Sequence, residues 1–468
     1  MSAWSLNKNQ SIEYLQSQNR NASTDPDAAF HNPAGVAFLA GNGLYLGGGN
    51  QIVLQDRTIT EPTDLLKAYG PQEYQGKIRV WLFPTVQAVY RMDDLSFFAH
   101  GGPLGGGGSG EFNQGLPKFD NMILGFANQI SSGVKAMVDT NYQQKLAAAS
   151  IPGQHVTTGS SQGFKYQRDL SFTGDEMTLG GTVGAAYKVL PNLSVSGAYR
   201  LSYARNAYKG TAKVSKLDVV FQGSQGMEMA GVSGSSVDDT LNFYANHVID
   251  SLWKNVDVDV VSTGIAHSIV LGLDFKPNEV WNFGMRVEWN GQMEVENKTS
   301  TLVAPDGLLP YLAGYADGAK SKITEPLVVA GGVSWKPILD LTLESSWTYE
   351  FSKDVDHDGR EANYHNSLIG GLGLRYKFTP RIETSFAYSY DWTIRNDLAR
   401  EETNFDLPTH YLSTGLGFQA IPRLRIDGGI MLGIVPDGHG VSVASGAGQT
   451  MSSTHLGLGL GLQWSPRI

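Results

Sequence analysis

The chain has 468 residues, of which 35 are basic and 45 are acidic, giving a net charge of −10. This acidic balance argues against nucleic acid as a partner, because the phosphate backbone attracts basic surfaces. There is no cysteine, which excludes both disulfide bonds and thiolate metal sites. Glycine accounts for 56 residues, yet aromatic residues make up 10%, so this glycine content is not that of a disordered linker.

No apolar run reaches the roughly 18 residues that a membrane-spanning helix needs. The start of the chain, Met1–Leu6, also lacks the basic and apolar stretches of a signal peptide. Two interpretations follow: a cytosolic protein, or a mature exported chain with an added initiator Met. The mean hydropathy of −0.20 does not exclude a membrane protein, because the strands of a membrane barrel alternate apolar and polar residues.

The first recognisable element is a turn that comes before every strand-like segment. In Asn32-Pro33-Ala34-Gly35, Pro33 fixes φ and pushes Asn32 toward an extended conformation, and Gly35 leaves the exit angle free. One interpretation is an ordinary surface turn. The other, which we adopt, is that residues 1–42 form a plug inside a wall built by residues 43–468.

Residues 79–91 alternate with a period of two, as expected for a strand with one apolar and one polar face. The apolar face carries Val80, Leu82, Val86, Ala88 and Tyr90. The same test identifies fourteen segments: 43–55, 79–91, 94–102, 177–190, 193–214, 258–276, 279–298, 325–337, 340–354, 364–378, 382–395, 409–421, 424–436 and 454–464.

The connections between these segments alternate in length. Tight turns, such as 92–93 and 277–278, alternate with long loops, such as 103–176 and 215–257. Short turns on one rim and long loops on the other are typical of a barrel in an outer membrane, and the aromatic residues gather near both rims. The sequence therefore predicts an all-β fold: a 14-stranded antiparallel transmembrane β-barrel with an N-terminal hatch in its lumen and helical extracellular loops.

Two of the long loops carry apolar residues at the helical spacing of three and four, within 118–149 and 236–254. The first segment carries Phe119, Met122, Ile123, Phe126, Ile130, Val134 and Met137, and the second includes Phe243 and Trp253. Two interpretations remain open. The helices simply pack their apolar sides, or they form a hydrophobic groove above the barrel mouth that binds a ligand.

The stretch Phe30-His31-Asn32-Pro33-Ala34-Gly35, followed by a first strand at Gly43-Leu44-Tyr45-Leu46, resembles the FadL/TodX family of outer-membrane channels for hydrophobic compounds. The resemblance covers the layout of the whole chain, but only this hatch motif matches in its amino-acid sequence. It implies a hatch motif made of Phe30, Asn32, Pro33, Ala34 and Gly35. It also implies uptake of long-chain fatty acids or hydrocarbons, with capture in the extracellular loops and a pocket beside the hatch.

Members of that family also have a kinked third strand that opens a hole sideways into the bilayer. The match in this chain is Gly101-Gly102-Pro103, directly after the strand Leu95–His100. Proline removes a ladder hydrogen bond and glycine weakens a strand, so we expect strand pairing to fail here and to leave a lateral opening. The alternative is that the strand ends and a flexible loop begins.

Charged residues fall on the polar faces near the middle of several strands. They are Arg200, Arg286, Glu288, Glu344, Arg375, Glu383 and Asp427. Two interpretations of these lumen charges remain open. They line a water-filled pore, or they form a socket that grips the plug through paired charges.

Three short motifs do not carry chemistry. Gly159–Gly163 matches a nucleophile elbow, but it lies in a Thr/Ser/Gly-rich loop and not between a strand and a helix. Asp354–Gly359 begins like a calcium loop, but its twelfth position is His365 and not Glu. The repeats in Gly457–Gly461 fit strand alternation and not dinucleotide binding, because no helix follows. We therefore expect no enzyme activity, no cofactor and no metal.

These observations predict a passive channel in the bacterial outer membrane that takes up hydrophobic molecules and releases them sideways near the third strand. The expected partners are fatty acids or hydrocarbons and outer-membrane lipid, and we expect a monomer. The alternatives are a general porin, a barrel for protein interaction or secretion, and an outer-membrane hydrolase that uses Ser161.

Overall fold

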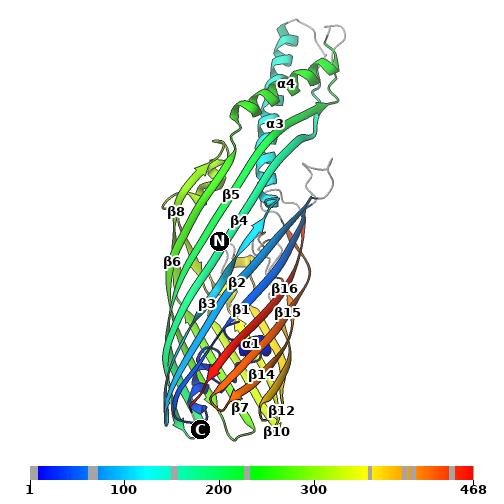
Figure 1. Cartoon of the computed structure of the whole chain (residues 1–468). Helices are drawn as coiled ribbons and strands as arrows, with labels where there is room; N and C mark the ends of the chain where they lie inside the picture. Colours follow the sequence, from blue (N-terminus) through cyan, green and yellow to red (C-terminus); the bar gives the residue numbers. More distant parts are fainter. Residues whose placement is uncertain are drawn as a thin grey trace.

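Fourteen strand positions close into one antiparallel barrel in the computed structural model of the chain (Figure 1). The structure describes residues 9–61, 72–148, 156–225, 232–356, 361–392, 398, 400, 402, 407–441 and 448–466. The barrel closes where β1 (Gly43–Glu61) pairs antiparallel with β16 (Gly448–Trp464). The other uninterrupted wall strands are β2 (Gln72–Met92), β3 (Leu95–Phe112), β4 (Ser160–Leu190), β5 (Leu193–Gln222), β6 (Val256–Phe275), β11 (Leu341–Glu350), β12 (Ser367–Thr379), β13 (Ile382–Trp392), β14 (Thr409–Ile421) and β15 (Leu424–Val441). The predicted barrel is confirmed.

The remaining two strand positions are interrupted. The predicted segment 279–298 is therefore wrong as a single strand, and the predicted segment 325–337 covers only the second part of its strand position. The first position consists of β7 (Trp281–Asn290) and β8 (Gln292–Val303), and the second of β9 (Lys320–Thr324) and β10 (Val328–Ile338). Pro326 lies in the second interruption, where it has no N–H to give to a ladder. Its carbonyl instead accepts a hydrogen bond from Asn290 Nδ2 at 2.8 Å, which joins the two interruptions.

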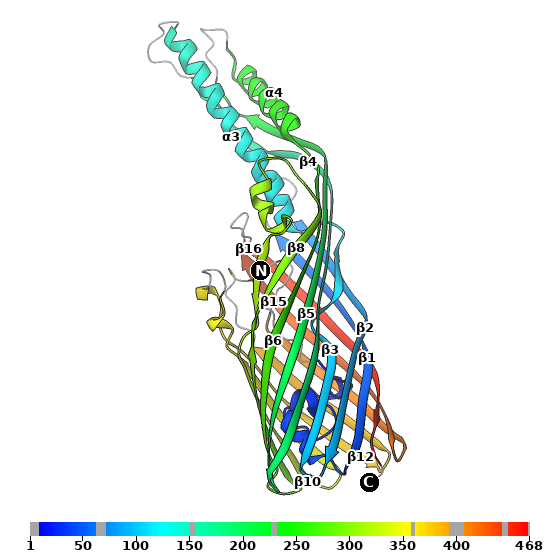
Figure 2. The same ribbon diagram turned by 90° about the vertical axis from the view of Figure 1, so that its left-hand side faces the viewer.

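The predicted loops 103–176 and 215–257 are partly wrong, because strands continue into both of them. β3 runs on to Phe112, β4 already begins at Ser160 and β5 ends only at Gln222. Buried and exposed residues keep alternating along these extensions, because their inner face packs against the loop helices. β4 and β5 therefore rise beyond the neighbouring wall strands and carry the loop helices (Figures 1 and 2).

Helices α3 (Pro117–Ala148) and α4 (Gly234–Leu252) form on the two predicted helical segments. None of the helices in the described part of the chain is both long enough and apolar enough to cross a bilayer. α4 lies along the part of β5 that has no partner in β6. There, Asn246 Oδ1 accepts the N–H of Val219 and Asn242 Oδ1 accepts the N–H of Phe221, each at 2.7 Å. The two amide Nδ2 groups donate back to the carbonyls of the same strand residues, so α4 takes the place of a neighbouring strand.

The outer face of the barrel is apolar around its circumference. Leu271 on β6, Leu372 on β12 and Leu460 on β16 are all more than half exposed. Near the short-turn rim, the rings of Trp281 and Trp335 stack at 5.3 Å, with their amphipathic rings at the depth of a membrane interface. A continuous apolar belt on the outside of a closed barrel fits lipid and not water, so the barrel spans a membrane.

Residues 9–41 lie inside the lumen (Figure 2), and nearly all of them are buried. We call this segment the hatch. It contains α1 (Ile12–Gln16), α2 (Ala28–His31) and the 3-10 helix η1 (Pro33–Phe38). Ser11 caps α1, because its Oγ accepts the N–H of Tyr14 at 3.1 Å. Further 3-10 helices in the loops are η4 (Leu309–Tyr315), η5 (Ser352–Asp354) and η6 (Glu361–Asn363).

Candidate functional site

The hatch motif is bound to the inner wall at β5 and β6. Asn32 Nδ2 donates to a carboxylate oxygen of Asp274 on β6 and, at 3.0 Å, to the carbonyl of Ser23. The carbonyl of Ala34 accepts a hydrogen bond from Ser194 Oγ on β5 at 2.7 Å. A side chain at Gly35 would place its Cβ only 2.3 Å from the Ser23 carbonyl oxygen, so this position requires glycine. The motif therefore fixes the end of the hatch to one side of the barrel.

A buried arginine of the hatch forms the centre of a second contact with the wall. Arg20 is 1% exposed and pairs with Asp27 and Asp25 of the hatch, each at 2.7 Å. Its Nη1 also lies 3.1 Å from Glu344 Oε1 on β11. A buried guanidinium needs such partners, because an unpaired buried charge is costly. Arg20 therefore joins the fold of the hatch to the wall.

The lumen charges continue this contact around the barrel. Arg375 on β12 pairs with Glu344 at 3.0 Å and reaches back to Asp25 of the hatch at 3.1 Å. Arg425 on β15 pairs with Glu383 and Asp427, each at 2.8 Å. In addition, Gln16 Nε2 of α1 donates to Asp427 at 3.1 Å. Charges of both signs thus form a paired network that contacts the hatch.

The other predicted lumen charges surround Phe30. Arg200 and Arg286 both pair with Glu288, at 2.5 Å and 2.8 Å. Their guanidinium carbons lie 5.1 Å and 5.3 Å from the centre of the Phe30 ring, which is the geometry of a cation–π contact. Arg286 Nη1 also donates to the Phe30 carbonyl at 2.5 Å. Phe30 is thereby held by charged side chains on β5 and β7.

The hydrogen-bond ladder between β2 and β3 is interrupted. The two strands pair up to Val86↔Gly101 and pair again only at Arg79↔Ser109. We call the unpaired stretch, residues 80–85 of β2 and 102–108 of β3, the seam. The alternative interpretation, in which the strand ends after Gly102, is wrong, because β3 continues to Phe112 through its pairing with β4.

The seam follows from the number of residues on each strand. From the pair Val86↔Gly101 to the pair Arg79↔Ser109, β3 advances by one residue more than β2. β3 gains its extra length at two irregularities against β4, one of them directly after Pro103. A one-residue mismatch turns side chains to the opposite face of a sheet, so no single register joins the two ladders. The break is therefore built into the strands themselves.

The hatch covers the inner side of the seam. Gln10 Nε2 donates to the carbonyl of Pro103 at 2.5 Å, and the carbonyl of Gln10 lies 3.2 Å from His100 Nε2. Above them, Leu104 is fully buried against Phe30. Of the predicted hatch motif, Phe30 thus lies at the seam, whereas Asn32 and Ala34 bond to β5 and β6 as described above.

A narrow pocket of about 20 Å³, enough for about one water molecule, lies between the hatch and the wall strands β11–β13. Its lining is mostly polar and includes Tyr14, Gln18, Asn19, His31 and Arg286. Tyr14 and His31 stack in parallel with ring centres 5.2 Å apart. A pocket of this size and lining fits a water molecule and not an apolar substrate.

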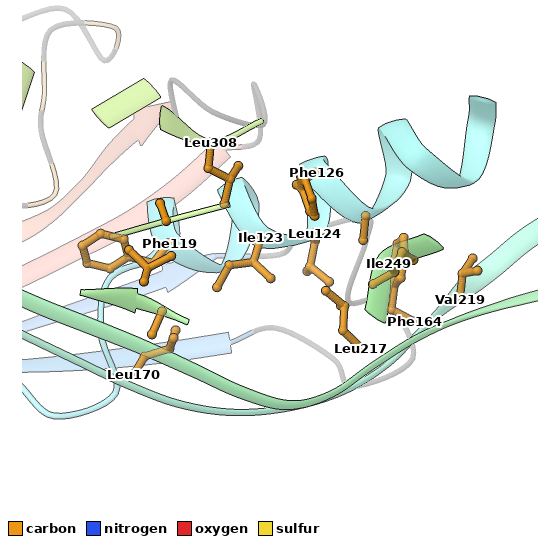
Figure 3. Close-up of a cluster of buried hydrophobic side chains, with 14 of the residues drawn as sticks. Phe119, Ile123, Leu124, Phe126, Phe164, Leu170, Leu217, Val219, Ile249 and Leu308 are labelled. Atoms are coloured by element: carbon orange, nitrogen blue, oxygen red, sulfur yellow. The ribbon is translucent and has the colours of Figure 1, made fainter. Parts of the chain in front are cut away.

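Most of the loop residues predicted to bind substrate belong to one buried apolar cluster, which we call the loop cluster (Figure 3). Phe119, Ile123, Phe126 and Val134 of α3 are buried in it, and Met122, Ile130 and Trp253 are packed against it. The ring of Phe126 lies 6.1 Å from that of Trp253. Met137 and Phe243 lie outside the cluster, with exposed fractions of 53% and 66%.

No protein-family model matches this sequence, and no curated protein matches it significantly. Solved structures do match. A Pseudomonas aeruginosa FadL homologue superposes with a TM-score of 0.63 at 14% identity, covering 99% of each chain. The Pseudomonas putida toluene transporter TodX gives 0.58 at 12% identity, covering 99% of this chain and 100% of its own. The CymD monoaromatic hydrocarbon channel gives 0.51 at 12% identity, with 95% and 93% covered.

This chain has the FadL/TodX fold. At these identities the likeness is one of fold, and at that level it confirms the resemblance drawn from the sequence. The three matched proteins are named as a FadL homologue, a transporter and a channel, and none as an enzyme.

Sequence reasoning missed several residues that hold the FadL/TodX fold together here. Arg20 and Asp274 were missed, because their partners in the wall and the hatch lie hundreds of residues away. The role of Pro84 was also missed, although the sequence contains a signal for it. A proline within the predicted strand 79–91 indicates an interrupted ladder, because proline has no N–H to donate. It lies on the β2 side of the seam, as Pro103 lies on the β3 side.

A buried polar group at the base of α3 was also missed. Asp120 is 1% exposed and accepts hydrogen bonds from Tyr166 Oη at 2.8 Å, from Arg168 Nε at 2.6 Å and from Tyr74 Oη. These partners lie on β2 and β4, so α3 is fixed to the raised wall by polar bonds inside an apolar surrounding. Because they come from strands far apart in the sequence, no local motif could reveal them.

The motifs set aside as carrying no chemistry are placed as follows. Ser160 and Ser161 are the first residues of β4, so a strand and not a helix follows the elbow-like motif. Asp354 ends the 3-10 helix η5, and the rest of the calcium-like loop, from 357 to 360, lies outside the described residues. Within the described ranges, no three His, Asp or Glu side chains gather in a way that would hold a metal ion.

Proposed function

We propose that this protein is a passive channel of the bacterial outer membrane that takes up hydrophobic molecules and releases them sideways into the bilayer. The observation that carries the proposal is the combination of a filled lumen with a broken wall. The hatch fills the lumen and is bound to the wall by the Arg20 contacts. Beside it, the hydrogen-bond ladder between β2 and β3 is interrupted. The matched proteins TodX and CymD are a toluene transporter and a monoaromatic hydrocarbon channel, which supports a hydrophobic substrate here.

The direction of release follows from the free energy of transfer. Burying apolar surface stabilises a molecule by about 0.8 kcal/mol for each CH₂ group that leaves water. A hydrophobic substrate therefore gains more by entering lipid than by passing through a lumen lined with charges such as Arg375 and Glu383. A sideways route needs a gap in the wall, because a continuous ladder leaves no passage. The start of the seam at Gly102 and Pro103, next to the last paired residue Gly101, is our candidate for that gap.

We assign roles to the remaining residues on the same basis. Residues 1–42 form the hatch and residues 43–468 form the barrel. The hatch motif at Phe30, Asn32, Pro33, Ala34 and Gly35 anchors the hatch. We assign substrate capture to the loop cluster, whose apolar side chains, among them Phe126 and Trp253, are packed between the loop helices and the strands.

The test is to fill the start of the seam with side chains. Substituting Gly101→Val, Gly102→Thr and Pro103→Val adds one N–H donor and two side chains to β3 and replaces the proline ring with a valine side chain. We expect this triple variant to bind a fluorescent fatty acid as the wild type does, and to lose its uptake into cells. Gly181→Val is the matched control: Gly181 pairs with Gly101 from β4, and nothing lies within 4 Å of its added Cβ. Wild-type uptake by a correctly folded triple variant would refute lateral release.

A further inference from the structure

β2 carries a bulge beside the seam, on the edge that faces β1. Two of its residues, Trp81 and Leu82, lie opposite the single residue Ile52 of β1. The side chain of Asn50 holds this bulge on both sides. Its Oδ1 accepts the N–H of Phe83 at 2.9 Å, and its Nδ2 donates to the carbonyl of Trp81 at 3.1 Å. The bulge therefore has its own hydrogen bonds, supplied by a side chain instead of a ladder.

The bulge turns two consecutive apolar side chains to the outside. Trp81 is 66% exposed and Leu82 is 71% exposed. Their neighbours Val80 and Phe83 are buried, at 7% and 1%. A regular strand cannot place two successive side chains on one face, because its side chains alternate. Since residues 80–85 have no partner in β3, these two side chains stand at the lipid-facing edge of the seam.

The position of the bulge along β2 gives its depth in the membrane. Trp81 lies eleven residues before Met92, which ends β2 at the short-turn rim. With a rise of about 3.3 Å per residue and a strand tilt of about 40°, this separation is about 28 Å along the membrane normal. The apolar band of such a barrel is about 25 Å tall. Trp81 and Leu82 therefore lie at the outer-leaflet edge of the band.

We propose that Trp81 and Leu82 form an apolar lip on which the substrate passes from the seam into the outer leaflet, and that Asn50 is the positioning residue of this lip. A hydrophobic molecule at the seam contacts these side chains before it contacts lipid. It therefore does not have to pass over exposed polar backbone groups. The inference rests on the proposed function, because a lip has a role only if release is lateral.

The first test removes the lip. We expect Trp81→Ala combined with Leu82→Ala to lower the maximal uptake rate by about tenfold, equivalent to about 1.4 kcal/mol. The half-saturating substrate concentration should stay unchanged, because the loop cluster is intact. Trp289→Ala is the matched control, since Trp289 is 64% exposed on β7, five strand positions from β2 around the barrel. Equal uptake rates in the double variant and the wild type would overturn the inference, and so would an equal loss in the control.

The second test addresses Asn50 without touching the lip. Asn50→Val removes both hydrogen bonds and should lower the maximal rate as the lip variant does. Asn50→Gln keeps a donor and an acceptor and should recover part of that rate. No loss in the Asn50→Val variant, with the barrel folded, would overturn the positioning role.

The outcomes separate the lip from the proposed function. If the Gly101, Gly102 and Pro103 variant abolishes uptake while the lip variant transports normally, lateral release stands and the lip is refuted. If the wild type takes up no hydrophobic compound at all, the proposed function fails and the lip fails with it.

Discussion

Removing the guanidinium of Arg20 should loosen the hatch, and the structure sets the size of the effect. In the variant Arg20→Met, Asp27 loses its charged partner while its side chain stays fully buried. Glu344 keeps Arg375 at 3.0 Å, and Asp25 keeps the same arginine at 3.1 Å. Breaking a buried ion pair by removing one partner costs about 3–5 kcal/mol. Because only Asp27 is left without its arginine, we expect the lower end, about 3 kcal/mol.

A loss of about 3 kcal/mol corresponds to about a 150-fold larger population of undocked hatch. Hydrogen exchange of residues 9–41, measured by mass spectrometry on the detergent-solubilised barrel, reports this population directly. The double variant Arg20→Met with Asp27→Asn should recover most of the protection, because the buried carboxylate is then neutral. If the single variant exchanges within about twofold of the wild type, the charge network does not hold the hatch, and this reasoning is refuted.

Three further predictions concern the hatch and the loops. Deleting residues 1–42 should leave a folded barrel with a large conductance in planar bilayers, because the strands close without this segment; unchanged conductance would contradict the plug. Placing aspartate at Ile123 and Phe126 should weaken fatty acid binding, measured by fluorescence titration, because both side chains lie in the loop cluster, whereas Met137→Asp, at an exposed position, should bind as the wild type does. Burial at the N-terminus of α3 raises the pKa of Glu402 to about 7, above its ordinary value of 4.5. Docking of α3 should therefore be tightest at low pH and weaken as the pH rises to about 7, and Glu402→Gln should remove this dependence in hydrogen exchange.

The alternation of residues predicted the barrel but not its irregularities. Within 79–91 the pattern places Val80 and Leu82 on one face, whereas the structure buries Val80 in the lumen and exposes Leu82 to lipid. The bulge at Trp81 adds one residue and so reverses the faces of everything beyond it. Both faces of this stretch contain apolar residues, so the alternation of residues fits a strand with or without the reversal and does not reveal the bulge.

The hatch was predicted from a local sequence motif, but its contacts with the barrel wall were not predicted. The turn at Asn32-Pro33-Ala34-Gly35 depends on neighbouring residues, so it is visible in the sequence. The Arg20–Glu344 pair joins residues 324 positions apart, and only the closed barrel brings them together. The predicted lumen charges identified the wall residue of such a pair but not its partner in the hatch. Their alternation shows that they point inward, but not which group of the hatch they meet.

The amides of Asn242 and Asn246 bear on how the folded protein avoids aggregation above the membrane. An open strand edge is a template on which another chain can add, and it is a common start of aggregation. Beyond the last pair with β6, the edge of β5 at Val219 and Phe221 would be such a template. Because a helix side satisfies these backbone groups and has no free edge of its own, the sheet ends there without inviting a second copy. The extended strands β4 and β5 can thus be long and apolar on their inner side without leaving these backbone groups open to another chain.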